Sequence, residues 1–535
     1  MLKIDQLKLK PGQSEAHLRQ KAAACLRVDV SDITAFTVLR RSVDAREDLA
    51  LVYTVAVALH REDAVLKRCR SHRVSRYQPR VYQLPAPCPA PALAPVVVGA
   101  GPAGLFAALV LSRCGVPPIL LERGECVEQR QQTVAHFWRT GQLHTQSNVQ
   151  FGEGGAGAFS DGKLNTGTKD IRHRYIMETL VAAGAPESIL TDAKPHVGTD
   201  RLHIALKGLR RELLALGCDI RFGHRMIGIE TAGGILTALR VCDASGSEYT
   251  LPCRQAVLAL GHSARDSFEM LYRAGVQMEQ KPFAVGVRIE HRQAAIDAAQ
   301  YKKWAGHPAL GAASYKLACH LPNGRSAFSF CVCPGGQVVA AASETERVVT
   351  NGMSEYARSG ENINGALLVN VTPDDFPDTH PLAGIAFQRQ LEDAAYRLGG
   401  GSYAAPCQRV EDFLLHRPTI APGTVQPSYA PHVTYADLHD CLPPFICETL
   451  EQALPLLGSR LPGYDDKDAL LTAVESRSSS PLRILRDESG QANICGLYPG
   501  GEGAGYAGGI LSAAADGMRL AEQILCNISQ TMPKE

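Results

Sequence analysis

Residues 96–104 read VVVGAGPAG, and this stretch determines the fold expected for much of the chain. The three β-branched residues Val96–Val98 predict a short strand that is too apolar to lie on the surface. Gly99, Gly101 and Gly104 follow with the spacing of a dinucleotide-binding turn. The first glycine permits a tight turn, the second lets a pyrophosphate approach the backbone, and the third lets the next helix pack against the strand. Free N–H groups and the dipole at the start of that helix favour phosphate binding.

An acidic residue closes the second predicted strand, as a dinucleotide site requires. This strand, Ile119–Leu121, leads into Glu122, whose carboxylate is expected to accept hydrogen bonds from an adenosine ribose. The same glycine spacing recurs at 152–157 and 503–508, but only the first match stands between a clear strand and a helix. A tight turn without a ligand is the alternative. We therefore predict a dinucleotide site that includes Gly99, Gly101, Pro102, Ala103, Gly104, Glu122 and Arg123.

Composition argues against several classes of partner. The 535 residues include 55 basic and 54 acidic side chains. This balance lacks the excess of positive charge that is typical of proteins that bind nucleic acid or an anionic membrane. The first ten residues lack the apolar core of a signal peptide, and the longest apolar run is too short for a membrane span. The 16 cysteines lie at irregular spacing, which is typical of reduced thiols. We expect a cytoplasmic protein of two or three domains that acts on a small molecule.

Five segments are expected along the chain. Residues 1–80 predict a small α+β domain, and the proline-rich residues 81–95 predict an extended linker. The first part of a nucleotide-binding domain follows at 96–280, an inserted substrate or cap domain at 281–473, and the last part of the nucleotide-binding domain at 474–535. The first domain has a basic edge that is interpreted either as a solvated face or as a docking site for a protein partner, namely Arg40, Arg41, Arg46 and Arg61.

The order of elements after the first two strands indicates which dinucleotide binds. Helices are predicted at 126–141, 172–183 and 201–216, a meander of short strands follows, and a buried strand at 256–260 leads into Gly261-His262. Far downstream, a strand at 494–498 and a helix at 507–525 are joined by the glycine-rich turn PGGEGAG. This order is similar to the FAD domain of the glutathione-reductase-like flavoproteins, in which the last strand and helix return to the first sheet. FAD is therefore the expected cofactor, ahead of NAD.

Five motifs in this order resemble the bacterial FAD-dependent dehydrogenase family: GAGPAGLFAAL, FGEGGAGAFSDGKL, ALGHSARDSF, ESRSSSPLRILRD and GLYPGGEGAGYAGGI. The resemblance covers almost the whole chain and implies FAD, a redox role and no settled substrate. The flavoprotein resemblance also implies that Glu502 binds the ribityl chain and that N–H groups around Tyr506 and Ala507 stabilise negative charge on the flavin. Gly261, Gly503 and Gly505 belong to the same expected cofactor site. The predicted fold is α/β, with a Rossmann-like FAD-binding domain, an inserted mixed α+β domain and a small N-terminal α+β domain.

The loop at 151–167 is the first candidate for the chemistry. Gly154, Gly155 and Gly157 are expected to cradle the isoalloxazine ring, with Asp161 and Lys163 close to its N5 atom. A lysine at this place would donate a hydrogen bond or stabilise the anionic reduced ring. The alternative is a structural turn in which Asp161 and Lys163 form a surface ion pair.

Two further candidates follow predicted strands. His262 stands after the return strand and suits proton transfer at neutral pH, although a structural histidine is an equal alternative. Arg477 precedes the final strand and is expected to bind an anionic substrate or a phosphate, with a solvated loop as the alternative.

Two weaker clusters are interpreted as structural. Cys331 and Cys333 lack the spacing of a disulfide reductase, and two core thiols are favoured over a redox pair. No metal site is predicted, because the metal-type residues do not have zinc spacing: His432, Asp437, His439, Asp440 and Cys441.

The sequence therefore predicts a FAD-dependent oxidoreductase of the dehydrogenase or reductase class. A second complete nucleotide-binding unit is absent from the sequence, so electrons come either from the substrate or from NAD(P)H bound transiently at the insertion. Two alternatives stay open. One is a flavin monooxygenase, and the other is a non-enzymatic or RNA-modification-linked flavoprotein whose N-terminal domain docks a partner.

Overall fold

The fingerprint strand lies in the middle of a five-stranded parallel sheet in the computed structural model, which describes residues 1–45, 48–69 and 71–531. All neighbouring strands in this sheet run parallel, and helices cover it. Its central strands are therefore buried, which explains why their sequences are continuously apolar. The strand order is β23 (Leu497–Pro499), β11 (Ala256–Leu258), β5 (Val96–Val98), β6 (Ile119–Glu122) and β7 (Asp219–Phe222).

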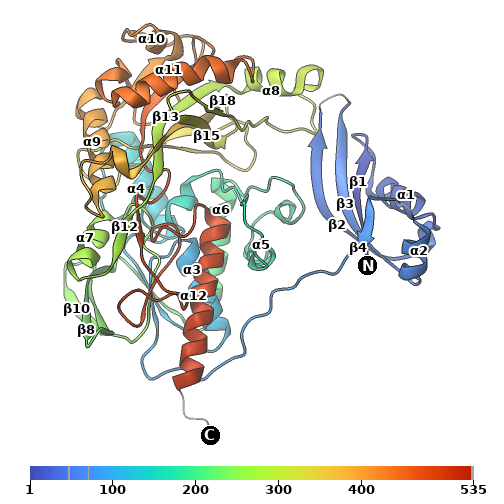
Figure 1. The fold of residues 1–535 in the computed structure, drawn as a ribbon, viewed down its shortest axis with the longest axis horizontal. Coiled ribbons are helices and arrows are strands. Elements are labelled where there is room, and N and C mark those ends of the chain that lie inside the picture. Colours follow the sequence, from blue (N-terminus) through green and yellow to red (C-terminus); the bar gives the residue numbers. More distant parts are fainter. Residues whose placement is uncertain (46–47, 70, 532–535) are drawn as a thin grey trace.

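Two helices that are far apart in the sequence pack side by side on this sheet (Figure 1). They are α3 (Pro102–Arg113), which follows the fingerprint, and α12 (Ile510–Thr531), from the end of the described chain. Their backbones approach closely, because a Cβ atom on Gly517 of α12 would lie 2.0 Å from the carbonyl oxygen of Ala103. The other helices of this domain are α4 (Val127–Thr140), α5 (Arg172–Ala182) and α6 (Thr199–Ala215). The return of the last strand and helix to the first sheet is as predicted.

The expected β-meander is a separate three-stranded antiparallel sheet. Its strands are β8 (Arg225–Ala232), β9 (Ile235–Cys242) and β10 (Glu248–Pro252), in the order β10-β9-β8. The chain then enters β11 and α7 (Arg265–Arg273). The expected α/β fold class, a parallel sheet with helices and a further domain, is confirmed.

The segment between the two parts of this domain forms a seven-stranded mixed sheet. Only β19 and β20 run parallel to each other; the other neighbouring pairs are antiparallel. The order is β14 (Ala318–His320), β15 (Ser326–Cys333), β18 (Asn362–Val371), β13 (Phe283–Arg292), β21 (Leu470–Glu475), β19 (Ala405–Arg409) and β20 (Val433–Tyr435). Two-stranded ribbons accompany it, β12 (Met278–Gln280) with β22 (Leu482–Ile484) and β16 (Gln337–Ala340) with β17 (Thr350–Met353). Its helices are α8 (Gln293–Tyr301), α9 (Ala383–Leu398), α10 (Val410–Leu414) and α11 (Pro444–Gly458).

The N-terminal residues form a small α+β unit that an extended segment joins to the rest of the chain (Figure 1). Its sheet has the order β2-β3-β1-β4, and its apolar residues form a core of their own. The elements are β1 (Leu2–Leu9), α1 (Glu15–Leu26), β2 (Ile33–Asp44), β3 (Ala50–Leu59), α2 (Glu62–Arg68) and β4 (Val74–Arg76).

Part of the basic edge predicted on this unit is an internal contact. Arg41 lies on the edge strand β2, its N–H donates to the carbonyl of Thr191 at 2.7 Å, and its carbonyl accepts from Ala193 at 2.8 Å. Its guanidinium pairs with Asp192 at 2.9 Å. A free strand edge offers unpaired backbone groups, and here the larger domain satisfies them. The Arg41 side chain is nevertheless exposed, as expected of a solvated face, while its backbone makes a contact within the chain. Docking of a partner at this edge stays a prediction, and Arg46 lies outside the described residues.

Within the described part of the chain, no helix combines the length and the apolar composition that a membrane crossing needs.

Candidate cofactor-binding and active site

A cavity of about 330 Å³ is lined by both large domains. One part of its wall, which we call the glycine region, is formed by residues around the fingerprint: Gly99, Gly101, Pro102, Ala103, Glu122, Arg123, Gly152 and Gly155. Another part, which we call the charged region, is formed by Asp161, Lys163, His262, Cys331, Glu475, Arg477 and Glu502.

Gly99 and Gly104 are required by close approaches of backbone, whereas Gly101 borders open space. Gly99 has a φ of 102°, and a Cβ atom there would lie 2.3 Å from the carbonyl oxygen of Ala259. A Cβ atom on Gly104 would lie 1.8 Å from the oxygen of Gly99, so this glycine lets α3 pack against the turn. Gly101 and Gly155 face each other across the cavity wall, where a Cβ on Gly155 would come within 3.2 Å of the Gly101 Cα. These two bare residues leave backbone exposed for a ligand.

The first turn of α3 is open to an anion. Gly101 is the N-cap residue and has no side chain to satisfy the N–H groups of this turn, and Pro102 at the first helical position has no N–H. Ala103, at the second position, lines the cavity. The helix start therefore presents N–H groups and the positive end of the helix dipole to the cavity, which suits a pyrophosphate.

Glu122 has a second task that sequence reasoning missed. Its carboxylate accepts hydrogen bonds from the backbone N–H groups of Ala100 at 2.8 Å, Gly124 at 2.9 Å and Gly152 at 3.0 Å. An ionised carboxylate accepts about four hydrogen bonds, so one position remains for a ribose hydroxyl. Glu122 thus fastens the fingerprint turn to the loop at 152 and still lines the cavity.

Arg123 is held in place by protein contacts. Its guanidinium pairs with Asp266 through two bonds of 2.9 Å and lies 4.1 Å from the centre of the Phe151 ring. These contacts fix it at the wall of the cavity, where it can offer a cation without reorganising.

The loop at 151–163 reaches the fingerprint turn through its backbone. The N–H of Gly154 donates to the carbonyl of Ala100 at 2.8 Å, and its Cα packs against Leu206, so Gly154 docks the loop but does not line the cavity. Gly155 and Gly157, in a short 3₁₀ helix over Gly155–Phe159, do line it. The loop is therefore positioned beside the expected cofactor, with one of its three predicted glycines in a supporting place.

Asp161 and Lys163 form an ion pair, but it is not on the surface. Asp161 is 1% exposed and accepts hydrogen bonds from Ser354 at 2.5 Å and from the Arg358 Nε at 2.9 Å, while Lys163 Nζ lies 3.0 Å away. Burial alone would raise the pKa of Asp161, but Lys163 and Arg358 lower it. Asp161 therefore stays ionised and holds Lys163 at the cavity wall.

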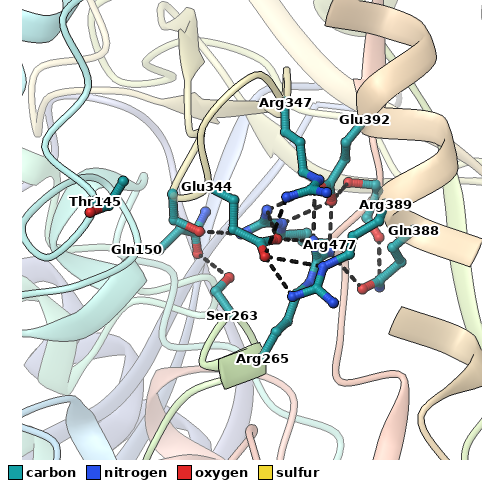
Figure 2. Close-up of polar contacts among 12 residues, drawn as sticks. Thr145, Gln150, Ser263, Arg265, Glu344, Arg347, Gln388, Arg389, Glu392 and Arg477 are labelled. Carbon is teal, nitrogen blue, oxygen red and sulfur yellow. Dashed lines mark hydrogen bonds and ion pairs between the residues drawn. The ribbon is translucent and has the colours of Figure 1, made fainter. Parts of the chain in front are cut away.

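Arg477 is not free to bind a substrate. Its guanidinium forms two bonds with the buried carboxylate of Glu392, at 2.9 and 2.8 Å, and a third with Ser343 at 2.5 Å. Arg265 binds the same carboxylate through two bonds of 2.7 and 2.8 Å (Figure 2). Arg477 thus has a structural role in place of the expected anion binding, because its guanidinium already pairs with Glu392 and Glu344.

The residues around Glu392 form a buried charged network that joins the two large domains. Figure 2 shows the side chains of α7, α9 and the segment after β21 converging on it. Glu344 bonds Arg265 at 2.6 Å and Arg389 at 2.7 Å, and Gln388 accepts from Arg265 at 2.9 Å. We call this set the Glu392 network: Arg265, Glu344, Gln388, Arg389, Glu392 and Arg477.

His262 lies at the cavity beside this network. Burial, followed by the cations of Arg477 and Arg265, lowers the pKa of His262 to about 3. Its Nδ1 atom is 3.0 Å from the hydroxyl of Ser263, which donates to Gln150 at 3.0 Å. The ring is therefore neutral at pH 7 and can bind a ligand or donate a neutral hydrogen bond, but it does not serve as a reservoir for a proton.

Two glutamates in the charged region have properties that the sequence did not reveal. Burial raises the pKa of Glu475 to about 7, although Arg288 opposes the shift from 3.4 Å. Burial also raises the pKa of Glu502 to about 7, with Lys281 opposing it, and no hydrogen-bond donor among the described residues reaches this carboxylate. Both carboxyl groups line the cavity and can exchange a proton near neutral pH. Glu475 opens the motif ESRSSS, which was the only available signal for it.

The C-terminal turn differs from the prediction in register. Helix α12 begins at Ile510, three residues later than predicted, so Gly508, Gly509 and Ile510 line the cavity. Tyr506 instead donates its hydroxyl proton to the carbonyl of Ile484, and its ring packs against Arg486. The reason is that a run of glycines delays helix formation after the turn.

The remaining residues predicted in this turn support the cavity from outside. Gly503 packs against the backbone of Gly261, where a Cβ atom on Gly503 would lie 2.5 Å from the Gly261 oxygen, and Gly261 itself lines the cavity. Gly505, Tyr506 and Ala507 line a second hollow, which shares Gly508 and Asn165 with the main cavity.

The metal-type residues of the inserted domain are only partly brought together. His439 binds Asp437 at 2.6 Å through Nδ1 and Glu451 at 2.8 Å through Nε2. Burial opposes the charge on His439, but these two carboxylates outweigh it and raise the histidine pKa. Both imidazole nitrogen atoms are thus held by carboxylates, which favour the protonated form.

Three family models match the chain over successive regions. Residues 1–59 match a domain of unknown function (DUF8436), residues 93–267 match a FAD binding domain, and residues 282–478 match the family described as FAD-dependent protein, C-terminal domain-like. A protein of Clostridium beijerinckii described as an uncharacterized protein is 45% identical over 513 residues, which cover 95% of each chain.

Several solved structures show a distant likeness. A glycerol-3-phosphate dehydrogenase from Bacillus halodurans complexed with FAD is 12% identical with a TM-score of 0.35, over 82% of this chain and 64% of that one. A triple mutant of the flavin-dependent brominase Bmp2 is 12% identical with a TM-score of 0.37, over 82% and 81%. The anhydrotetracycline hydroxylase OxyS from Streptomyces rimosus is 14% identical with a TM-score of 0.34, over 82% and 63%. These values are too low to support a shared activity.

The parallel sheet, the glycine region and the matched domains define a FAD-binding flavoprotein. The chain belongs to the same family as the Clostridium beijerinckii protein, and its own matches to FAD-dependent domains mark it as FAD-dependent. FAD is thus the cofactor that the family supports, as predicted. The affiliation with the bacterial dehydrogenase subfamily and with the glutathione-reductase-like superfamily stays a prediction.

Proposed function

We propose that the chain is a FAD-dependent dehydrogenase or reductase, in which FAD occupies the cavity and a small molecule meets it at the inserted domain. The observation that carries this proposal is that one cavity joins a backbone-lined phosphate site to a cluster of titratable side chains from both domains. Binding sites commonly lie where two domains meet.

The residues of the glycine region fit the adenosine and pyrophosphate parts of FAD. Gly101 and Gly155 leave room for phosphate beside bare backbone, the start of α3 offers N–H groups, and Glu122 keeps one acceptor position for a ribose hydroxyl. Glu502, whose carboxylate has no donor among the described residues, would accept a hydroxyl of the ribityl chain. When bound, FAD supplies two-electron transfer at its isoalloxazine ring.

The charged region is suited to moving protons and stabilising negative charge beside that ring. Lys163, held by Asp161, offers a permanent cation, because neighbouring negative groups outweigh burial and raise the lysine pKa. Glu475 and Glu502 exchange protons near pH 7, and the neutral His262 orients a ligand. Strands β15 and β21 contribute Phe330, Cys331 and Glu475 to the wall of this region.

Anaerobic reductive titration tests the proposal. Purified protein is expected to carry a flavin absorbance spectrum, and NADH or NADPH is expected to bleach it if a nicotinamide is the electron donor. Bleaching by neither leaves the substrate as the donor and calls for a screen of reduced small molecules. A colourless protein that takes up no added FAD would contradict the proposal.

A flavin monooxygenase is the second candidate, because the cavity by itself is compatible with either class. The two differ in how the reduced protein meets oxygen. A dehydrogenase or reductase is expected to reoxidise slowly in air and faster with an organic acceptor, measured by the return of flavin absorbance. Fast reoxidation by oxygen alone, after rapid reduction by NADPH, would favour the monooxygenase.

A further inference from the structure

Two cysteines stand where strand β15 departs from regular geometry beside the cavity. Phe330 pairs with Ala366 and Cys333 with Asn364 on β18, so β15 carries one extra residue between them. Cys331 has a φ of 42°, a conformation that is uncommon for a residue other than glycine. Bulges of this kind redirect side chains and are frequent beside active sites. Here the bulge places Cys331 in the wall of the cavity, while Cys333 is fully buried behind it.

The two thiols are in contact. The Cys333 Sγ lies 3.3 Å from the carbonyl oxygen of Cys331, and its thiol is also hydrogen-bonded to the Cys331 sulfur. The sequence favours two core thiols because the spacing is neither CxxC nor CxxxxC. The structure replaces that interpretation with an accessible thiol and a buried partner on adjacent positions of one bulge.

Two cations lie against this pair. The ammonium of Lys163 donates to the carbonyl of Val332, between the cysteines. The Arg288 guanidinium donates to the carbonyl of Cys331 at 3.0 Å and approaches the Cys333 sulfur at 3.7 Å. Positive charge at these places stabilises a thiolate over a thiol.

The electrostatics separate the roles of the two sulfur atoms. The hydrogen bond from Cys333, followed by the Lys163 and Arg288 cations, lowers the pKa of the Cys331 thiol despite its burial. Cys333 has its pKa raised by that same hydrogen bond and by burial. The accessible Cys331 sulfur is thus the nucleophile. The buried Cys333 sulfur keeps its proton until the disulfide forms.

No comparable shift occurs at the other cysteines in the described part of the chain. Where their thiol pKa is shifted it is raised by burial, as at Cys218, Cys253, Cys407 and Cys441. These thiols are inert in their surroundings.

We propose that Cys331 and Cys333 form a redox-active dithiol that exchanges two electrons with the FAD of this cavity. The Cys331 thiolate and the Cys333 thiol together lose two electrons and one proton as one S–S bond forms. Oxidised FAD takes up those two electrons and the proton to give anionic FADH⁻, so charge and atoms balance. In the opposite direction, reduced FAD returns the pair to thiolate and thiol. This proposal rests on the proposed binding of FAD. It extends the proposed function to substrates that undergo thiol–disulfide exchange.

The electron capacity of the FAD-loaded protein tests this proposal. After mild oxidation with diamide and desalting, anaerobic dithionite titration of the wild type is expected to consume two electrons per FAD beyond the two that FAD takes. The variants Cys331→Ser and Cys333→Ser are expected to consume only the two electrons of FAD. The matched control is Cys495→Ser, at an exposed cysteine far along the chain, which is expected to retain the extra uptake.

Alkylation and peptide mass spectrometry supply a readout that does not depend on flavin. Diamide should protect both Cys331 and Cys333 of the wild type from labelling and remove two hydrogen masses from their peptide. In the reduced protein, iodoacetamide should label Cys331 at lower pH than it labels Cys495, and Lys163→Met should shift that dependence upward.

The outcomes separate the two proposals. Equal electron uptake by wild type and both serine variants, with Cys331 and Cys333 still labelled after diamide, would overturn the dithiol while FAD binding stands. A protein that takes up no FAD yet loses both labels would contradict the proposed function and leave the disulfide in place. Because the labelling is measured on the wild type, misfolding of a serine variant does not obscure the result.

Discussion

The glycine region and the charged region of the cavity are built by opposite means. In the glycine region the ligand would meet mainly backbone, at Gly101, Gly155 and the start of α3. In the charged region almost every side chain already has a partner in the protein, as Asp161 and Arg477 do. The difference teaches that a short motif specifies the first region, whereas the second exists only once both domains have assembled.

The largest effect is expected where the charged region depends on the Glu392 network. The substitution Glu392→Gln removes the fully buried carboxylate that Arg265 and Arg477 share and leaves them only Glu344 as a charged partner. Removing one partner of such a buried network is expected to cost about 3–5 kcal/mol of unfolding free energy. Urea denaturation measures it, and the matched control is Glu248→Gln, whose exposed pair with Arg240 is worth about 0–1 kcal/mol.

The same variant has a defined pH dependence. Burial would raise the pKa of Glu392, but Arg265 and Arg477 lower it well below its usual range. Its stabilisation is therefore complete above the unfolded pKa of about 4.3 and is lost as pH falls toward the folded value. The gap between wild type and Glu392→Gln should narrow below pH of about 4. A small, pH-independent gap would mean that the charged region is not built on this network.

The next effect is expected in the glycine region and concerns binding alone. Gly101→Val fills the space beside Gly155 without strain, because Gly101 has a φ of −77° and a Cβ atom there would have no neighbour closer than 3.9 Å. The variant should fold normally but lose FAD affinity by at least about 100-fold, or about 2.7 kcal/mol. Titration of the flavin-free protein with FAD, followed by fluorescence, measures the loss.

The control for this variant is Gly167→Val. A Cβ atom there has nothing within 4 Å, and the residue lies outside the main cavity. It should bind FAD like the wild type. If Gly101→Val also bound FAD normally, the distinction between a backbone-lined and a side-chain-lined region would fail.

The smallest effect is expected at Glu502, where a charged side chain lacks a hydrogen-bond donor among the described residues. Its folded pKa of about 7 lies above the unfolded value, so the flavin-free protein loses stability as pH rises from about 4.5 to 7. Glu502→Gln should abolish this contribution and raise Tm at pH 8 by about 1–2 °C. Thermal scans at pH 5 and pH 8 measure it. A variant that is less stable than the wild type at pH 8 would show that Glu502 has an unrecognised partner.

Much of the fold could be predicted because it follows from local patterns. The apolar run Val96–Val98, the glycines after it and the acid at Glu122 depend on residues close in sequence, and the structure places them as expected. The mixed α+β composition expected of the inserted domain is likewise present. The start of α12 was predicted three residues too early. The glycines at 508 and 509 disfavour a helix, and the apolar pattern used for the prediction does not take account of them.

The candidate site could be predicted only in part, because partners distant in sequence decide what a charged residue does. Arg477 looks like a ligand for an anion until Glu392, on another element, neutralises it. His262 looks like an acid–base group until burial and two neighbouring guanidinium groups lower its pKa. Cys331 looks like a core thiol until a bulge and Lys163 give it a place at the cavity. These partners are too distant in sequence for a local pattern to predict them.

The position of β23 and α12 also bears on how the protein is made. The fingerprint strand β5 ends at Val98, but β23, which shares the sheet with it, begins at Leu497, and Glu502 and Gly509 complete the cavity wall. A ribosome therefore releases the phosphate-binding turn long before the strand and helix that enclose the cofactor. During this interval the whole inserted domain is synthesised and can fold around its own core. Stable uptake of FAD thus waits for residues 497–531, and flavin binding reports that translation has passed the last strand of the sheet.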